Sequence, residues 1–488
     1  MKKILSMLAI TVLATSFWAC SDDVATPDAP SINEPSIVDV LVGEATELTF
    51  ELEIPGGYQE AEVSATGGTA VLTSEPTDGS KSGDVVVTFT ADNTPGAASV
   101  TLTVTDKNNK TDEETLNLVK GNQVTVTTNI TTNTTWESGR VYILATRVTV
   151  LTGVTLTIEP GVIVKGQAGT GANATALLVA RGGKLMAEGT ALSPIIFTSV
   201  ADEIEPGEIE SPNLAPTANG LWGGVIILGK AKISASAAEV QIEGIPTSDT
   251  NGLYGGSDDT DNSGVIKYIS IRHGGTNIGS GNEINGLTLG GVGSGTVIDH
   301  VEVVANQDDG IEFFGGTVSV SNVVVWNSYD DGLDTDQAWN GTVDNFIIVA
   351  PNTGSAFELD GPEGTYLNGN HTFTNGTVYA GPAIADLIDF DANSNVQMSN
   401  IYFYGFSNAT AVKEYAAMIA FGGSTSSVAD FEHTLAGATN TDPAVVFLGI
   451  PAGELTAVAV NANTVGANAT VFDWTWARES GALEDIGL

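Results

Sequence analysis

Two short stretches of the chain begin with the same three residues and then place acidic side chains between apolar ones. They read "DDGIEFFGG" from Asp308 and "DDGLDTDQA" from Asp330. Carboxylates bind hard cations such as Ca²⁺, and pairs of carboxylates hydrolyse glycosidic bonds. The recurrence predicts that the fold brings several carboxylates together.

A repeat of one coil per 22 to 30 residues surrounds these stretches. The segments "DHVEVV", "SNVVVW", "DNFIIV", "TNGTVY" and "SNIYFY" place a His or Asn at His300, Asn322, Asn345, Asn375 and Asn400. These spacings suit the coils of a parallel β-helix, with a loop inserted in the third interval. We expect the Asn side chains to stack and to hydrogen-bond from coil to coil.

The strand that opens each coil alternates apolar and polar residues. The five openings are "GLTLG", "GIEFF", "GLDTD", "AFELD" and "LIDFD", beginning at positions 286, 310, 332, 356 and 387. Successive side chains of a strand point to opposite faces. The inward positions are then Leu287, Ile311, Leu333, Phe357 and Ile388, followed by Leu289, Phe313, Thr335, Leu359 and Phe390. The outward columns are Thr288, Glu312, Asp334, Glu358 and Asp389, and Gly290, Phe314, Asp336, Asp360 and Asp391.

Such a column concentrates negative charge. Neighbouring strands lie about 4.8 Å apart, where two like charges repel by about 0.9 kcal/mol in water and about 3.5 kcal/mol at an effective dielectric near 20. No Lys or Arg lies between Gly274 and Val412, against 17 acids. We therefore predict a Ca²⁺ site formed by Glu312, Asp334, Asp336, Glu358 and Asp360. The alternative is a solvated acidic face.

Further residues near this face are candidates for ligand contact. Asp389 and Asp391 extend the columns, and Phe314 and Trp339 could stack on sugar rings, as could Trp326 and Tyr329; core packing is the alternative for the aromatic residues. A second acidic segment, "SDDTDNSG" at 257–264, has the composition of a calcium loop without the EF-hand spacing.

Sequence patterns in other parts of the chain also indicate a β-helix. The stretches "GVTLTIEPGVIVKGQ", "GGKLMAEGTALSPIIFTS" and "GLWGGVIILGKAKI" resemble the opening coils of right-handed parallel β-helices, the fold of pectate lyases and many surface adhesins. The resemblance runs from about Asn122 onward. It implies a right-handed parallel β-helix at 121–488, and the closing "FDWTWARESGALEDIGL" is expected to form its last coil or cap.

A different pattern precedes it. Runs such as "ATELTFELEI", "GDVVVTFTAD" and "ASVTLTVTD" alternate apolar and polar residues between turn signals, which predicts short antiparallel strands. Residues 33–120 resemble the immunoglobulin-like β-sandwich modules of bacterial surface proteins. The fold class is therefore all-β, with a sandwich followed by a β-helix.

The first residues are typical of an export signal. Residues 1–19 combine a basic start with an apolar run, and Cys20, the only cysteine, follows Ala19. This resembles a bacterial lipoprotein signal, which implies acylation of Cys20; the alternative is an ordinary secretory signal. Residues 20–32 would be a flexible tether, and "SDD" after Cys20 resembles a tag for the outer face of the outer membrane. The chain is similar to outer-membrane surface lipoproteins without an assigned activity.

The charge of the chain excludes one class of partner. The sequence has 59 acidic and 17 basic side chains, and removal of the signal with Lys2 and Lys3 leaves 15 basic ones. Such a field repels nucleic acid, so we expect no nucleic-acid binding.

Three functions remain open. The first is a lipid-anchored binding protein that holds a polysaccharide or a surface protein through the Ca²⁺-dependent acidic face. The second is a polysaccharide-degrading enzyme that uses two carboxylates; a lyase is the weaker form, because the resemblance implies a basic residue and only Arg272 or Lys413 borders the acidic coils. The third is a structural subunit of an outer-membrane assembly.

The lipoprotein hypothesis predicts that Cys20→Ser abolishes membrane association, because the acylated sulfur would be lost. Detergent partitioning and labelling with a radioactive fatty acid measure this. A Cys20→Ser protein that still partitions into detergent and carries label would contradict the hypothesis.

Overall fold

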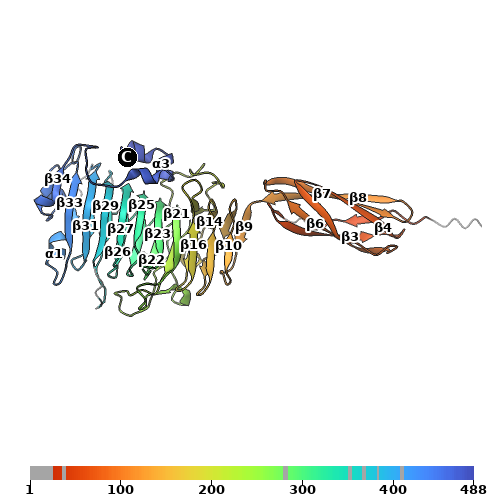
Figure 1. The fold of residues 1–488 in the computed structure, drawn as a ribbon, viewed down its shortest axis with the longest axis horizontal. Coiled ribbons are helices and arrows are strands. Elements are labelled where there is room, and N and C mark those ends of the chain that lie inside the picture. The colour runs from red at the N-terminus through yellow and green to blue at the C-terminus, as the bar shows by residue number, and fades with distance from the viewer. Residues whose placement is uncertain are drawn as a thin grey trace, which may run out of the picture. The chain divides into compact units, whose positions relative to one another are not determined.

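The computed structural model describes residues 26–35, 40–278, 284–349, 354–364, 366, 370–381, 384–406 and 411–488. Cys20 and the signal segment lie outside the described residues. The chain divides into two compact units, one ending at Asn122 and one beginning at Gln123 (Figure 1).

The first unit is a β-sandwich, because alternate residues of its strands bury apolar side chains in one core. Its sheets have the orders β1-β3-β6-β5 and β2-β8-β7-β4. Their bounds are β1 Ser31–Asn33, β2 Val40–Leu41, β3 Ala45–Glu53, β4 Tyr58–Thr66, β5 Gly68–Ser74, β6 Ser82–Ala91, β7 Gly96–Asp106 and β8 Thr111–Gly121. Strand pairs are antiparallel except β2 with β8. Phe50, Phe89 and Leu102, from both sheets, are fully buried between them.

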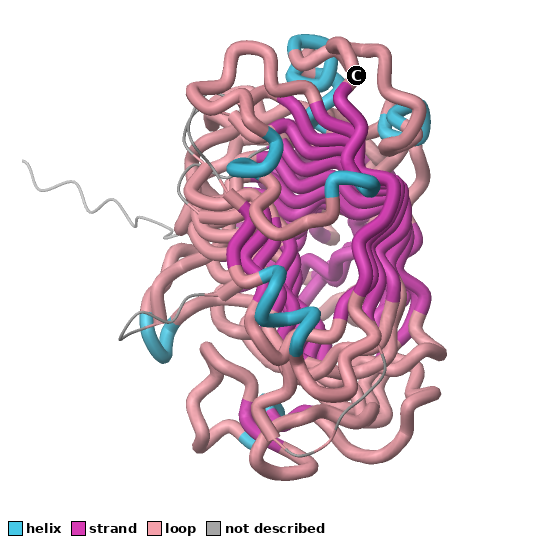
Figure 2. The backbone as a smooth tube through the Cα atoms, turned by 90° about the vertical axis from the view of Figure 1, so that its left-hand side faces the viewer, coloured by secondary structure: helices cyan, strands magenta, loops and turns pink. Residues whose placement is uncertain are grey.

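The second unit is a right-handed parallel β-helix whose equivalent strands lie one behind another along the coils (Figure 2). We call its nine-stranded sheet the short-strand sheet. It runs in the order β12 Val148–Val150, β15 Leu177–Val179, β18 Val225–Leu228, β22 Leu287–Gly290, β24 Ile311–Phe314, β26 Leu333–Asp336, β28 Phe357–Leu359, β30 Ile388–Phe390 and β32 Val412–Lys413.

The remaining parallel strands form a second, branched sheet, which we call the long sheet. In its first coils it has two rows of short strands: β9 Gln123–Val126, β11 Val141–Leu144, β14 Ile163–Gly166 and β17 Ile195–Ser199 in one row, and β10 Thr134–Trp136, β13 Thr155–Ile158 and β16 Lys184–Glu188 in the other. Both rows join at β21 Gly264–Arg272. The sheet continues through β23 Val297–Val304, β25 Val320–Trp326, β27 Thr342–Val349, β29 His371–Tyr379, β31 Val396–Tyr404, β33 Ser427–His433 and β34 Leu455–Ala457.

The long strands bend at one residue per coil, and these are the residues of the predicted ladder. His300, Asn322, Asn345, Asn375 and Asn400 all have φ between 56° and 59°. Asn tolerates this left-handed conformation better than most residues. The Nδ2 of Asn345 donates to the Oδ1 of Asn322 at 2.7 Å, and that of Asn400 to the Oδ1 of Asn375 at 3.3 Å. The coil-to-coil ladder is confirmed for these two pairs, whereas Asn322 and Asn375 donate to Asp299 and Asp344 of the preceding coils.

The short elements lie outside the stacked strands. β19 Val240–Gln241 and β20 Leu253–Tyr254 form a hairpin in the insertion between β18 and β21. The helices are α1 Tyr415–Ala420, α2 Pro443–Val446, α3 Trp476–Glu479 and α4 Ala482–Asp485, with 3₁₀ turns at Gly171–Asn173, Thr250–Gly252, Ala452–Glu454 and Ala469–Phe472. None of the helices in the described ranges is long and apolar enough to cross a lipid bilayer.

The last residues return along the β-helix instead of forming its final coil as expected. The last strand is β34, and α3 then lies beside β21, β23 and β25 (Figure 1). Trp476 packs on Trp326 and on the guanidinium of Arg272. The buried Glu302, 3.7 Å from Arg272, accepts a hydrogen bond from the backbone of Ala477. The segment thus covers an apolar outer face of the long sheet.

The ladder predicts an ordered pair of stability effects. Asn345→Ala should lower the free energy of unfolding by about 2–3 kcal/mol, because it loses side-chain hydrogen bonds to Asn322 and Asn468 and places alanine at φ 59°. Asn345→Gly loses the same bonds without the backbone strain and should cost less. Denaturant unfolding measures both, and equal stability of the two variants would contradict the strain argument.

Candidate functional site

The acidic residues of the short-strand sheet stack in the predicted register. Thr288 pairs with Glu312, Glu312 with Asp334, Asp334 with Glu358, and Glu358 with Asp389. The alternate residues, such as Leu333 and Phe357, are fully buried in the core. The column therefore runs along the outside of the coil, as the alternation predicts.

Three of the acids form a compact group that we call the acidic centre: Asp309, Glu312 and Asp334. Each offers a carboxylate oxygen, and these oxygens all lie within 4.8 Å of one another. Glu312 is only 7% exposed and Asp309 only 6%. Glu312 accepts a hydrogen bond from Asn285, but the enclosed Oδ1 of Asp334 has no hydrogen-bond partner among the described residues. A buried carboxylate oxygen without a partner is costly, so a bound positive charge would stabilise it.

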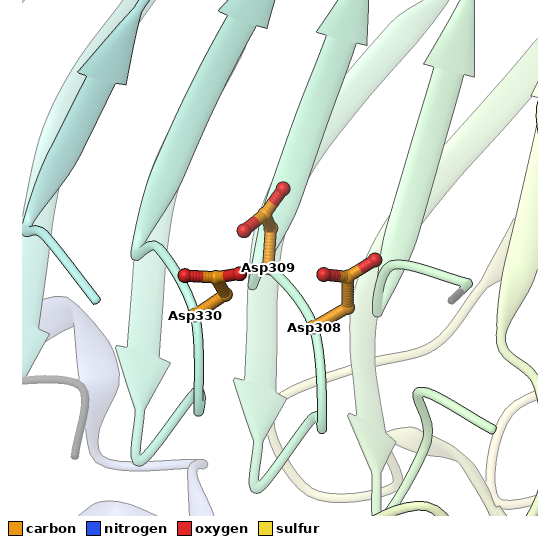
Figure 3. A group of neighbouring side chains, drawn as sticks. All are labelled: Asp308, Asp309 and Asp330. Atoms are coloured by element: carbon orange, nitrogen blue, oxygen red, sulfur yellow. The ribbon is translucent and has the colours of Figure 1, made fainter. Parts of the chain in front are cut away.

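A second acidic group shares Asp309 with this centre. Carboxylate oxygens of Asp308, Asp309 and Asp330 also lie within 4.8 Å of one another. Figure 3 shows that they come from the turns of two neighbouring coils, with Asp308 and Asp330 on either side of Asp309. Asp330 is exposed, so the acidic groups extend from the buried centre to the surface.

Burial and mutual repulsion raise the pKa of these carboxyls. Burial raises the pKa of Glu312 well above the ordinary range, and the charge of Asp309 raises it further. Burial likewise raises the pKa of Asp309, and the charge of Asp334 adds to that shift. Burial does the same to Asp334, with the charges of Glu312 and Glu358 adding to it. Burial and mutual repulsion therefore favour the protonated forms of these three carboxyls, and a bound cation would offset both effects.

The shift extends beyond the centre. Burial, followed by the charge of Glu363, raises the pKa of Asp336 to about 8. Burial, and a hydrogen bond that protonated Glu358 donates to the carboxylate of Asp331, raise the pKa of Glu358 to about 8. The pKa of Asp360 rises to about 6 through burial and the charge of Glu358. All five residues predicted as metal ligands thus lie on one shared acidic surface, while only Glu312 and Asp334 belong to the centre.

Turn residues just before the strands complete the site, and the sequence reasoning did not assign them. The backbone N–H of Asp331 donates to the Oδ1 of Asp309 at 2.8 Å, and that of Ser355 donates to Asp331. The side chain of each of these turn residues therefore accepts a hydrogen bond from the backbone of the equivalent turn in the next coil. The repeated "DDG" was the available signal, because its second Asp occupies this position in both coils.

An insertion encloses part of this face, which explains why the acids are not simply solvated. The backbone of Lys232 accepts from Gly316, and that of Ser234 donates to Gln337. The ring of Tyr254, in the insertion, packs against that of Phe314, with 6.0 Å between the ring centroids. The segment after β18 thus contacts the turns that follow β24 and β26.

The outlying acids have other surroundings. Asp389 pairs with Lys413, the next residue of its column, at 2.7 Å. Asp391 is exposed beyond β30, and its N–H donates to Leu359. The column therefore ends at a basic residue.

Three of the four aromatic residues named as stacking candidates are buried, whereas the fourth, Tyr329, is half-buried and donates a hydrogen bond to the backbone of Thr217. Trp339 is fully buried and stacks on Phe313 at 4.0 Å inside the coil. Phe314 is 6% exposed and packs in an apolar cluster with Tyr254. Trp326 lies on the long sheet against Trp476. These residues are part of the core, because the turn after β26 directs Trp339 inward.

Two other sequence-based assignments also change. Arg272 cannot serve the acidic face, because it is buried on the long sheet beside Glu302. In the segment 257–264, the acids bind the protein itself: Asp258 caps Thr260, Asp259 pairs with Lys232, and Asp261 accepts from Lys230. These bonds account for the acids without a calcium ion.

A family model described as a pectate-lyase-like β-helix domain matches residues 127–478. The chain belongs to this family. No curated protein matches it by sequence. The family model covers the acidic surface and the long sheet, so the fold of the second unit is that of the family.

Two solved structures are similar to the chain. The family 28 exopolygalacturonase of Yersinia enterocolitica is 12% identical, with 85% of this chain and 88% of that chain covered and a TM-score of 0.20. The catalytic unit of the thermostable GH87 α-1,3-glucanase of Streptomyces thermodiastaticus is 11% identical, with 89% and 96% covered and a TM-score of 0.29.

The raised pKa values predict the direction of the pH dependence. Asp336, with a pKa of about 8, keeps its proton in the folded state where the unfolded chain releases it. Without divalent cations, stability should therefore fall as the pH rises from about 5 to about 8, by at most about 1.4 kcal/mol per pH unit for each such carboxyl.

Thermal unfolding in EDTA across this range measures the effect. Asp336→Asn imitates the protonated acid and should flatten the profile, whereas Glu188→Gln, an exposed acid of the long sheet, should leave it unchanged. A wild-type stability that rises with pH in EDTA would contradict the argument.

Proposed function

We propose that this chain is a lipid-anchored cell-surface protein whose β-helix binds Ca²⁺ at the acidic centre and holds a polysaccharide there. The observation that carries the proposal is the enclosed Oδ1 of Asp334, which lacks a hydrogen-bond partner among the described residues, on a carboxylate that lies within 4.8 Å of those of Asp309 and Glu312. Oxygen-only ligands favour Ca²⁺ over Zn²⁺.

The charge of the surroundings supports a cation. The sequence between Gly274 and Val412 contains no Lys or Arg, and Lys413 is paired with Asp386 and Asp389 at the far end of the column. Glu312 and Asp334 therefore stack without a basic neighbour in their own coils. A divalent cation would supply the missing positive charge.

The position of the centre supports a role in binding an extended molecule. Asp330, in the turn before β26, and Asp391, just after β30, are exposed at the ends of strands two coils apart in the sheet that carries the buried acids. Ca²⁺ accepts six to eight oxygen ligands, so three protein carboxylates leave positions for hydroxyl or carboxylate oxygens of a ligand. A polysaccharide offers such oxygens repeatedly. The membrane attachment is proposed from the lipoprotein-like signal that ends at Cys20.

One observation favours glycoside hydrolysis as a second function. Glu358 has a pKa of about 8 and is hydrogen-bonded to Asp331. A carboxyl that stays protonated at neutral pH can act as the general acid of such hydrolysis, with another carboxylate of the same face as base or nucleophile. The two functions separate experimentally: hydrolysis releases new reducing ends from a polysaccharide and is lost in Glu358→Gln, whereas binding alone leaves the polysaccharide length unchanged.

The cation proposal predicts that Ca²⁺ raises the melting temperature more than NaCl of equal ionic strength. At 100 times the dissociation constant, binding adds about 2.7 kcal/mol to the free energy of unfolding. The double variant Glu312→Gln, Asp334→Asn should lose the Ca²⁺ response and be more stable than the wild type in EDTA, because the repulsion is removed.

The matched control is Glu188→Gln with Asp485→Asn, two exposed acids outside the acidic surface. It removes the same charge and should keep the Ca²⁺ response. The proposal would be contradicted if the wild type had the same melting temperature in EDTA and in millimolar Ca²⁺ and calorimetry showed no heat of binding.

A further inference from the structure

A cavity at the other end of the short-strand sheet is a second candidate site, apart from the acidic centre. It has a volume of about 410 Å³. Its walls are the residues that follow β12, β15 and β18, and the part of the insertion from Glu239 to Asp258. Cavities of 300–1,000 Å³ accommodate small molecules.

The cavity concentrates positive charge in a strongly acidic chain. The second unit has only 11 Lys and Arg residues, and two of them, Arg181 and Lys230, line this one cavity. Arg181 is already committed, because its Nη1 lies 2.6 Å from Glu239 and donates to the backbone of Gly255 at 2.8 Å. It therefore holds two parts of the insertion against β15.

Lys230 differs from Arg181 in this respect. Its backbone N–H donates to Asp261 and its carbonyl accepts from Asp258, so these two hydrogen bonds hold its backbone in place. Its ammonium lies against Gly182, where an added Cβ would be 2.7 Å from Nζ. Within the described ranges the structure assigns this ammonium no ion pair. Lys230 thus presents a positive charge without an ion pair to a cavity whose lining also includes Asp258.

The opposite wall is rigid and polar. Arg147 pairs with Asp249 at 3.0 Å, and Asp249 accepts hydrogen bonds from the backbone and side chain of Asn251. These contacts hold the 3₁₀ turn Thr250–Gly252, which lines the cavity. Hydroxyl and amide groups beside a fixed charge suit a ligand with several hydroxyl groups, and Leu253 adds an apolar surface.

We propose that this cavity binds a small polyhydroxylated carboxylate, such as a sugar acid, with Lys230 pairing with the carboxylate. A singly charged ligand fits better than a phosphate. Glu239 neutralises Arg181, and the carboxylate of Asp258, which also lines the cavity, would repel a doubly charged anion.

Titration calorimetry in EDTA tests the proposal while keeping Ca²⁺ out of the acidic centre. The wild type should bind D-glucuronate at millimolar concentrations or below. Three other compounds should bind at least about ten times more weakly: D-glucose because it lacks the charge, acetate because it lacks the hydroxyl groups, and inorganic phosphate because it is not singly charged. Lys230→Gln should weaken glucuronate binding by about ten-fold or more, and Lys230→Arg should retain most of it.

The matched control is Lys184→Gln, which removes an exposed charge on the long sheet and should leave binding unchanged. Unchanged melting temperatures of all three variants would show that the fold is intact. The proposal is overturned if the wild type binds no glucuronate, if glucose or phosphate binds as well, or if Lys184→Gln weakens binding as much as Lys230→Gln. Because the assay contains no Ca²⁺, its outcome is independent of the cation proposal.

Discussion

Parallel pairing in register is the constraint on which the second unit depends. Each residue of a coil lies about 4.8 Å from its equivalent in the next coil, so any residue type that repeats in sequence becomes a stack in space. The same geometry has opposite energetic consequences for different side chains. Asn322 and Asn345 gain a hydrogen bond from it, whereas Glu312 and Asp334 gain a repulsion.

The acidic stack persists because the surrounding structure reduces its charge and orders its turns. Burial raises the pKa of Glu312 and Asp334, so protons can replace cations there. The turn residues Asp309 and Asp331 each accept a backbone hydrogen bond from the next coil, which fixes the strands that carry the stack. A fold selected only for stability would gain by replacing these acids with apolar residues. Their position beneath an insertion is consistent with the proposed cation-binding role.

The short-strand sheet is electrically asymmetric along the axis of the β-helix. Arg181 and Lys230 lie beside its first three strands, while the acids occupy β24, β26, β28 and β30. The insertion after β18 spans both regions, since Arg181 pairs with its Glu239 and its Ser234 contacts the turn after β26. One segment therefore shapes both the cavity and the cover of the acidic surface, and each can be tested without the other.

The repeat, the register and the outward column of acids could all be predicted from the amino-acid pattern. These properties are local: a period of two along each strand and one His or Asn per coil decide which face Glu312, Asp334 and Glu358 occupy. The two-unit organisation could also be predicted, because the pattern changes from isolated antiparallel runs to a repeated coil near Asn122.

Only the tertiary structure decided which of these acids are buried and which aromatic residues are accessible. The enclosure of Glu312 depends on the packing of the described loops and the insertion, and the inward direction of Trp339 depends on one turn. The cavity beside Lys230 joins residues from Thr152 to Asp258, about 100 positions apart in sequence. Contacts of that kind follow from how loops of unequal length fold over the coils, and no periodicity in the chain encodes them.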